Sequence, residues 1–115
     1  MEMRATLRNI RMPPRKGMLV ADLVRLKGCE DALAILEECS KRAAGPIAKL
    51  IRSALANAQE QNARHQAGID LDNLYVKSVT VDEGPRMWRI QARAMGRATW
   101  MRRSMSHITV VLGER

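Results

Sequence analysis

The chain has 115 residues and a formal net charge of +8, from 20 basic and 12 acidic side chains. This length favours a single domain over residues 1–115, and a hydrophobic content of 46% is enough for a core. The sequence holds no run of 18 apolar residues and no apolar stretch near its start, so we expect neither a transmembrane helix nor a secretory signal. The basic surplus indicates a polyanionic partner, either nucleic acid or an anionic membrane surface.

The positive charge is concentrated at the two ends of the sequence. Residues 1–16 carry five basic side chains and one acid, and residues 86–115 carry seven arginines and one acid. The segment between them has eight basic and ten acidic residues. Arginine presents a planar fork that binds phosphate in a bidentate manner and stacks on bases. Two arginine-rich arms on a nearly neutral body therefore favour structured nucleic acid over a membrane, which would accept lysine equally well.

The first third of the chain predicts an extended segment and two helices. Residues 3–12 are expected to be extended, and Pro14 suits the start of a helix over 15–27 that ends at Gly28. The apolar stripe of that helix is formed by Leu19, Val20, Leu23, Val24 and Leu26. A second helix is predicted over 30–39, because it opens with two acids, which favour a helix N-terminus.

A third helix has the clearest periodicity. Its apolar face is formed by Ile47, Leu50, Ile51, Ala54, Leu55 and Ala58. Ser40 is the candidate N-cap, but Pro46 removes a hydrogen bond from a helix that begins so early. The helix therefore either starts near Gly45 or has an irregular first turn, and we expect it to end near Asn62.

The remainder of the chain changes to an extended pattern. Strands are predicted over 74–81, with a bulge at Ser78, and over 107–112, with Ile108, Val110 and Leu112 on one face. Residues 86–103 hold six arginines and no acid, and their pattern fits either a helix or a β-hairpin with its tip near Arg93. If the two strands pair, this segment extends them into a ribbon that is not stable alone in water and requires a partner surface.

No arrangement of residues indicates catalysis or a cofactor. His65, assigned to a polar loop, and His107, which opens a strand, are far apart in sequence. Cys29 and Cys39 form no metal-binding spacing and are interpreted as reduced, buried side chains. Gly84 is interpreted as a turn residue. We therefore expect no enzyme activity, no metal and no cofactor; a small enzyme or protein-interaction domain built on the apolar helix face is the alternative from another class.

The two basic arms are the candidate nucleic-acid interface, with arginines neutralising phosphates and tryptophans stacking on bases. The predicted RNA-binding residues are Arg8, Arg11, Arg15, Lys16, Arg86, Trp88, Arg89, Arg93, Arg97, Arg102 and Arg103. A free regulator that binds DNA or RNA through the same arms is the second interpretation.

Several segments resemble ribosomal protein twenty-two of the large subunit, in its bacterial form. The similar segments are 13–28, 53–63, 79–98 and 106–112. The most specific match is Arg93-Ala94-x-Gly96-Arg97 followed by His107-Ile108-x-Val110. The resemblance runs in order from about residue 3 to the C-terminus. The sequence departs from the family's usual basic residue at Trp88 and usual lysine at Met95, and has an unusual proline at Pro46.

The resemblance implies an α+β fold, with three helices packed on a small antiparallel sheet and one long protruding β-hairpin at about 82–106. It also implies a structural constituent of the large ribosomal subunit that binds its ribosomal RNA, with no small-molecule substrate. Neighbouring ribosomal proteins and the nascent peptide are the other implied partners, because the hairpin tip lines the peptide exit tunnel. The implied tip residues are Arg89, Ala92, Arg93, Ala94, Met95, Gly96 and Arg97. The implied location is the ribosome of the cytoplasm, although a mature organellar chain would look the same.

Overall fold

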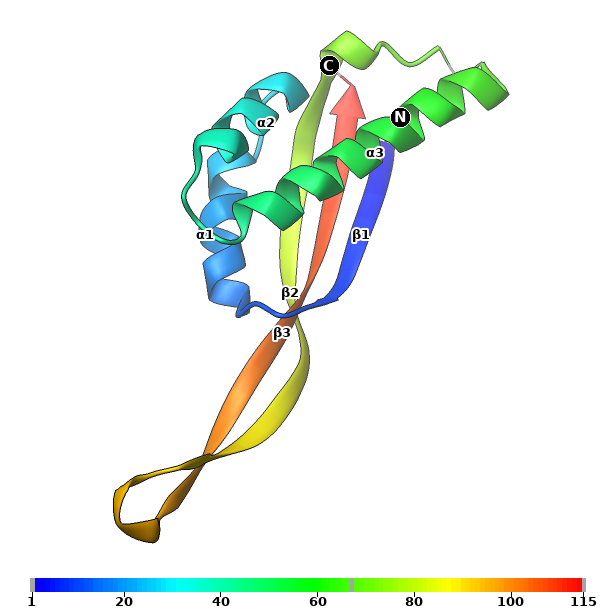
Figure 1. The fold of residues 1–115 in the computed structure, drawn as a ribbon. Helices are drawn as coiled ribbons and strands as arrows, with labels where there is room; N and C mark the ends of the chain where they lie inside the picture. The colour runs from blue at the N-terminus through cyan, green and yellow to red at the C-terminus, as the bar shows by residue number, and fades with distance from the viewer. Residues whose placement is uncertain (1, 67, 115) are drawn as a thin grey trace.

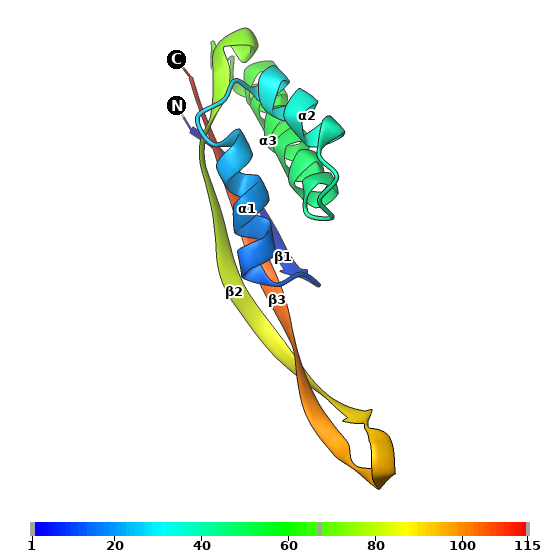
Figure 2. The same ribbon diagram turned by 90° about the vertical axis from the view of Figure 1, so that its left-hand side faces the viewer.

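The computed structural model describes residues 2–66 and 68–114. Three helices cover one face of a three-stranded antiparallel sheet with strand order β1-β3-β2 (Figures 1 and 2). Two of the strands continue beyond the sheet as a twisted hairpin that extends away from the helices, and the molecule is 66 Å long. The predicted α+β fold with one protruding hairpin is confirmed.

The last strand in the sequence is the central strand of the sheet. Its strands are β1 (Glu2–Ile10), β2 (Leu74–Ala92) and β3 (Ala98–Glu114). Ile108, Val110 and Leu112 of β3 are fully buried, as the alternation in the sequence predicts. The register of β2 against β3 shifts between Val76 and Ser78, which confirms the predicted bulge.

The first two helices are α1 (Pro14–Val24) and α2 (Cys29–Glu38), and the boundary between them differs from the predicted one. Gly28 does not end α1; it precedes α2 as its N-cap residue and forms an isolated bridge with Tyr75. The chain leaves α1 through Leu26, which has a φ of +66°. A left-handed residue other than glycine therefore makes the turn that was assigned to Gly28.

Three of the five residues in the predicted apolar stripe of the first helix are exposed. Val20 and Val24 are fully buried, but Leu19, Leu23 and Leu26 are 60%, 48% and 60% exposed. The helix instead turns its small residues toward the sheet, because a Cβ at Gly17 would lie 3.1 Å from a methyl carbon of Val81. The close approach that a glycine permits decides which face of the helix is buried.

The long helix α3 (Ala44–His65) buries the predicted face, with Leu55 partly buried and the other members buried. Its N-cap position is Ala43 rather than Ser40, which lies outside the helix. Pro46 is its third residue, where a backbone N–H has no intrahelical acceptor, so proline is tolerated there. The helix continues past Asn62 to His65, which corrects the predicted loop position of that histidine.

Candidate nucleic-acid interface

The basic segment 86–103 forms the hairpin, so the helical interpretation is wrong. Antiparallel pairing continues from Arg86 opposite Ser104 to Ala92 opposite Ala98. A short turn at 94–96 closes the tip, with Met95 and Gly96 at φ of +62° and +72°. Because β2 and β3 are anchored in the sheet, their pairing continues outward and overrides the helical spacing of the apolar residues.

Gly84 marks the place where the hairpin leaves the sheet. It lies within β2, at a register shift between Glu83 and Arg86, and is not in a turn as predicted. A Cβ at this position would be 3.1 Å from the carbonyl carbon and oxygen of Met105. The absence of a Cβ at Gly84 therefore allows the two backbones to approach this closely without displacement. Next to it, Arg86 Nε donates to Glu83 Oε1 at 2.5 Å, so this arginine is paired within the chain.

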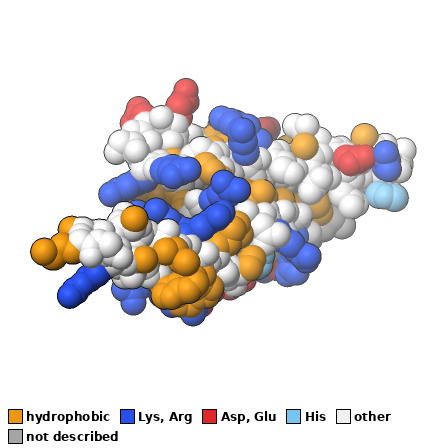
Figure 3. Space-filling model, turned by 60° about the horizontal axis from the view of Figure 1, so that its bottom comes forward, with side chains coloured by type: hydrophobic (Ala, Val, Ile, Leu, Met, Phe, Trp, Pro, Cys, Tyr) orange, Lys and Arg blue, Asp and Glu red, His pale blue; other side chains and the backbone are white. Residues whose placement is uncertain are grey.

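A basic groove lies where the hairpin meets the helices, and we call it the junction groove. It has a volume of about 450 Å³. Its lining is Arg11, Pro13, Lys16, Arg42, Met87, Arg89, Arg102, Arg103, Ser104 and Met105. Figure 3 shows Lys and Arg side chains gathered around the hollowed base of the hairpin. The lining therefore contains six cations and no acid.

The six cations come from distant parts of the sequence and are all exposed. Arg11 follows β1, Lys16 lies in α1 and Arg42 precedes α3. The other three extend from the two strands of the hairpin. None of them forms an ion pair with another described residue. Like charges without counter-ions raise the local positive potential, so the groove is suited to an extended polyanion rather than to a single small ion.

Arg42 is the residue that sequence analysis missed. It sits in the short turn between α2 and α3, within the segment of net negative charge. The neighbouring Ala43 and Ala44 are 2% and 3% exposed and pack in the core, which fixes the turn beside the groove. A second hollow of about 450 Å³ continues past Arg42 to Lys41. The adjacent pair Lys41-Arg42 was the available signal, but only the fold places it near the arms.

The structure brings together only part of the predicted set. Arg11, Lys16, Arg89, Arg102 and Arg103 share the junction groove. The others lie apart from it: Arg8 on β1, Arg15 in a hollow beside Glu83, Arg86 in its ion pair, Arg93 and Arg97 at the tip, and Trp88, exposed on β2. The predicted site is therefore one convergent groove plus an extended surface.

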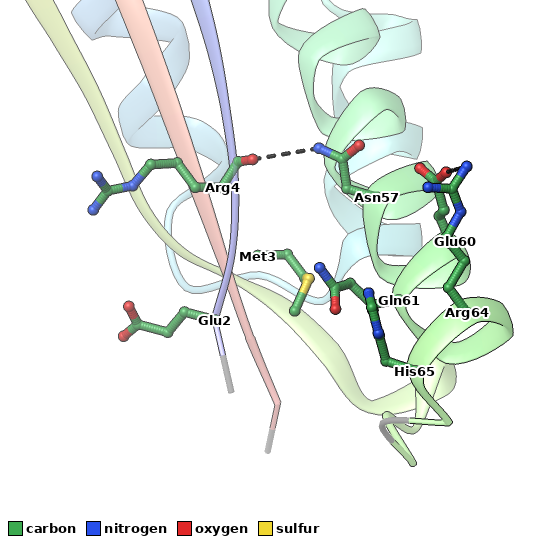
Figure 4. A pocket seen from close by; sticks show the side chains of 8 residues that line it. All are labelled: Glu2, Met3, Arg4, Asn57, Glu60, Gln61, Arg64 and His65. Atoms are coloured by element: carbon green, nitrogen blue, oxygen red, sulfur yellow. Dashed lines mark hydrogen bonds and ion pairs between the residues drawn. The ribbon is translucent and has the colours of Figure 1, made fainter.

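A different hollow, of about 310 Å³, lies between the start of β1 and the second half of α3 (Figure 4). Its lining is Glu2, Met3, Arg4, Asn57, Glu60, Gln61, Arg64 and His65. Arg64 pairs with Glu60 at 2.9 Å, and Asn57 Nδ2 donates to the carbonyl oxygen of Arg4. Glu2 pairs with Lys77, which lowers the pKa of Glu2 and raises that of Lys77. Its charges are balanced, unlike those of the junction groove.

His107 has a structural contact rather than a place in the groove. Its Nδ1 accepts a hydrogen bond of 3.1 Å from the backbone N–H of Asn9, which has a φ of +58°. Across residues 2–66 and 68–114, no three His, Cys, Asp or Glu side chains gather as a metal ion would need. No helix in the same ranges is both long and apolar enough to span a membrane.

The sequence profile of the family described as ribosomal protein L22p/L17e matches residues 5–113, which is nearly the whole chain. The chain belongs to this family. Among its relatives is the large ribosomal subunit protein uL22 of Thermoanaerobacter sp. (strain X514), 48% identical over all of this chain and 99% of the relative. The protein of the same name from Geobacter sulfurreducens is 49% identical over the same shares. That of Myxococcus xanthus is 47% identical over 99% of this chain and 97% of the relative.

Membership of the L22p/L17e family decides between the classes considered above. The family is one of ribosomal proteins, so the chain is a structural constituent of the large subunit and not an enzyme. The resemblance found in the sequence is thereby confirmed, and the free regulator and the small enzyme are set aside.

Proposed function

We propose that this chain binds large-subunit ribosomal RNA through the junction groove and the hairpin, and that the hairpin tip lines the nascent-peptide exit tunnel. The observation that carries the proposal is the junction groove, in which six unpaired cations and no acid converge at the base of an exposed ribbon. The predicted RNA-binding set and the predicted tip set take these two roles. The ribosome of the cytoplasm is the proposed location.

The hairpin needs a partner for its own stability. Residues 88–100 are all exposed, and an isolated two-stranded ribbon is at best marginally stable in water. RNA supplies both a surface and negative charge. Each phosphate that an arginine neutralises releases counterions, so the groove gains free energy of binding from the salt that leaves the RNA.

The tip is formed mostly by small side chains, which supports its proposed place in a narrow passage. Ala92, Ala94 and Gly96 have small side chains, whereas Met95 is 96% exposed at the end of the turn. Such a tip fits between packed RNA and the lumen of the exit tunnel. Met95 would then face the nascent peptide. Neighbouring ribosomal proteins and the nascent peptide are therefore the other proposed partners.

The RNA-binding half is tested with the purified chain and deproteinised large-subunit ribosomal RNA, by filter binding at several salt concentrations. We expect R89Q/R103Q to bind more weakly than the wild type and to reduce the salt slope by about 2, one unit for each lost phosphate contact. The matched control K27Q/R52Q removes the same charge from exposed positions outside the groove and should leave both quantities near those of the wild type. Equal losses in the two double variants would reject the groove as the binding site.

The tunnel half is tested by photo-crosslinking in ribosomes that carry a stalled nascent chain. A photoreactive amino acid at position 95 is expected to crosslink to the nascent chain, because Met95 lies in the turn that closes the hairpin and is almost fully exposed. The same amino acid at position 52, on α3, is the control and should give no such product. Crosslinks from position 95 to RNA alone would contradict the tunnel-lining role while leaving RNA binding intact.

A further inference from the structure

The hairpin carries an aromatic cluster on one of its two faces. Side chains two apart on a strand share a face, and so do residues paired directly across an antiparallel ribbon. Ile90 pairs with Trp100, and Trp88 lies two residues from Ile90 on the same strand. These three side chains therefore form one cluster, and Met87 and Arg89 lie on the opposite face.

All three side chains of the cluster are open to solvent. Trp88, Ile90 and Trp100 are 60%, 63% and 66% exposed. The sequence has two tryptophans, and both are in this cluster. Burying a large apolar side chain is worth roughly 1.5–3 kcal/mol, so folded domains seldom leave adjacent ones uncovered. None of the three belongs to the hydrophobic core of the body or, among the described residues, to the partly buried side chains packed against it.

Positively charged side chains border the cluster, and they limit which kind of partner can bind it. Arg102 pairs with Trp88 across the ribbon and so borders the cluster, although it also lines the junction groove, while Arg93 and Arg97 flank the tip beyond the cluster. The sequence has no acid from 84 to 113. An apolar protein surface placed here would desolvate arginines without supplying partners, which is costly.

Single-stranded RNA can cover the exposed rings and also pair with the arginines around them. Its bases offer flat apolar faces that stack on aromatic rings, and its phosphates pair with the bordering arginines. In a duplex the base faces are already stacked on one another, so a duplex offers only its phosphates. The combination of exposed rings and bordering cations therefore selects single-stranded RNA over double-stranded RNA.

We propose that Trp88, Ile90 and Trp100 form a stacking platform for unpaired bases of RNA. This inference rests on the proposed function, and adds that the hairpin recognises base faces on this side as well as phosphates in the junction groove. Both tryptophans lie in the platform, so the tryptophan fluorescence of the whole chain reports on this surface alone.

The first test titrates the full chain with oligouridylate of about 12 nucleotides, a length within the range of single-strand binding sites. Inorganic polyphosphate of similar charge is the matched probe without bases. We expect oligouridylate to quench the tryptophan emission and polyphosphate to bind with little quenching. Equal quenching by the two probes would overturn the platform, because the change would then come from phosphate binding alone.

The second test uses W88L/W100L, which keeps apolar side chains but removes the rings, and W88F/W100F, which keeps rings. Stacking contributes between about fivefold and about 150-fold per base, so the leucine variant, which lacks both rings, should lose at least about fivefold in affinity for labelled oligouridylate. Its affinity for polyphosphate should not change, and the phenylalanine variant should retain most of the binding. Circular dichroism checks folding, which we expect to be unaffected because both tryptophans lie outside the core.

The failures of the two proposals are distinguishable. If the wild type binds large-subunit ribosomal RNA and the leucine variant binds oligouridylate as well as the wild type does, the stacking platform is wrong and RNA binding stands. If the wild type binds neither RNA, the proposed function fails and the platform fails with it.

Discussion

The hydroxyl of Ser106 donates a hydrogen bond to the backbone carbonyl of Met12, and both residues are buried, at 0% and 5% exposure. Ser106 lies on β3 just inside the base of the hairpin, and Met12 lies in the segment that joins β1 to α1. Arg11 and Pro13, on either side of Met12, line the junction groove. One buried hydrogen bond therefore connects the body's wall of the groove to the strand that supplies its other wall.

Substituting Ser106 by alanine should destabilise the fold. The variant leaves the Met12 carbonyl buried without its donor, and an unsatisfied buried polar group costs about 1–3 kcal/mol. We expect S106A to lower the free energy of unfolding by that amount in a urea titration. S53A changes an exposed serine of α3 and should remain within about 0.5 kcal/mol of the wild type. Equal stability of S106A and S53A would show that the hydrogen bond does not contribute.

Two glycines are expected to respond to alanine by different amounts. At Gly84 the new Cβ would lie 3.1 Å from the backbone of Met105, and such overpacking typically costs about 1–3 kcal/mol. At Gly45, in the first turn of α3, no atom beyond the chain neighbours and the helix's own backbone lies within 4 Å of a Cβ. The ring of Pro46 disfavours helical backbone at a residue with a Cβ directly before it, which opposes the gain in helix propensity, so G45A should stay within about 0.5 kcal/mol of the wild type. Thermal unfolding of G84A and G45A measures both effects. A stabilised G84A would mean that the backbones separate without cost at the hairpin base.

The sequence predicts elements whose burial follows from local periodicity. The apolar face of α3 repeats over three turns, and the alternation at Ile108 and Val110 repeats along β3, so both buried faces were predicted correctly. The leucines of α1 have the same helical spacing but lie outward. Their position depends on how closely Gly17 lets the helix approach Val81, which is a contact between distant segments and leaves no periodic signal.

The candidate interface divides in the same way. The arginines clustered in sequence on the hairpin were predicted from charge alone, whereas the pattern of their segment left a helix and a hairpin with its tip near Arg93 equally open. Arg42 was missed because its neighbours in sequence make its segment acidic, and only the packing of Ala43 and Ala44 in the core places it beside Arg11. Charge patterns along a chain identify arms, whereas a groove formed by several segments requires the fold.

The two cysteines should differ sharply in reactivity. Cys29 is 5% exposed, and burial raises the pKa of its thiol to about 11 from an ordinary value of 9.0. Cys39 is partly exposed. The thiolate is the reactive form, so a disulfide reagent at about pH 8 should modify Cys39 rapidly and Cys29 only when the chain unfolds. The measurement follows the reaction in C39S, where Cys29 is the remaining thiol, with and without denaturant.

The raised pKa of Cys29 also gives the direction of its pH dependence. The folded state holds the proton more tightly than the unfolded state, so this stabilising contribution is fully present below the unfolded pKa. It is lost as the pH rises from about 9 toward about 11. C29A, which lacks the thiol, should therefore lose less stability than the wild type over that pH range. Rapid modification of native C39S would contradict the buried position of Cys29.

Arg42 provides the sharpest test of the junction groove, because only the fold places it in the interface. If its guanidinium contacts an RNA phosphate, R42Q should reduce the salt slope of binding to large-subunit ribosomal RNA by about 1 and weaken binding by about tenfold. R42K retains the charge but not the bidentate fork, so it should keep most of the slope and lose part of the affinity.

The matched control for Arg42 is R52Q, which removes one exposed arginine of the next helix, α3, outside the groove. If only the net charge mattered, the salt slope of RNA binding would fall equally in both variants. If Arg42 contacts RNA in the groove, the slope should fall in R42Q only. Equal salt slopes for R42Q and R52Q would mean that the α2–α3 turn does not touch RNA. The groove would then act through the arginines of the arms alone, which sequence analysis had already predicted.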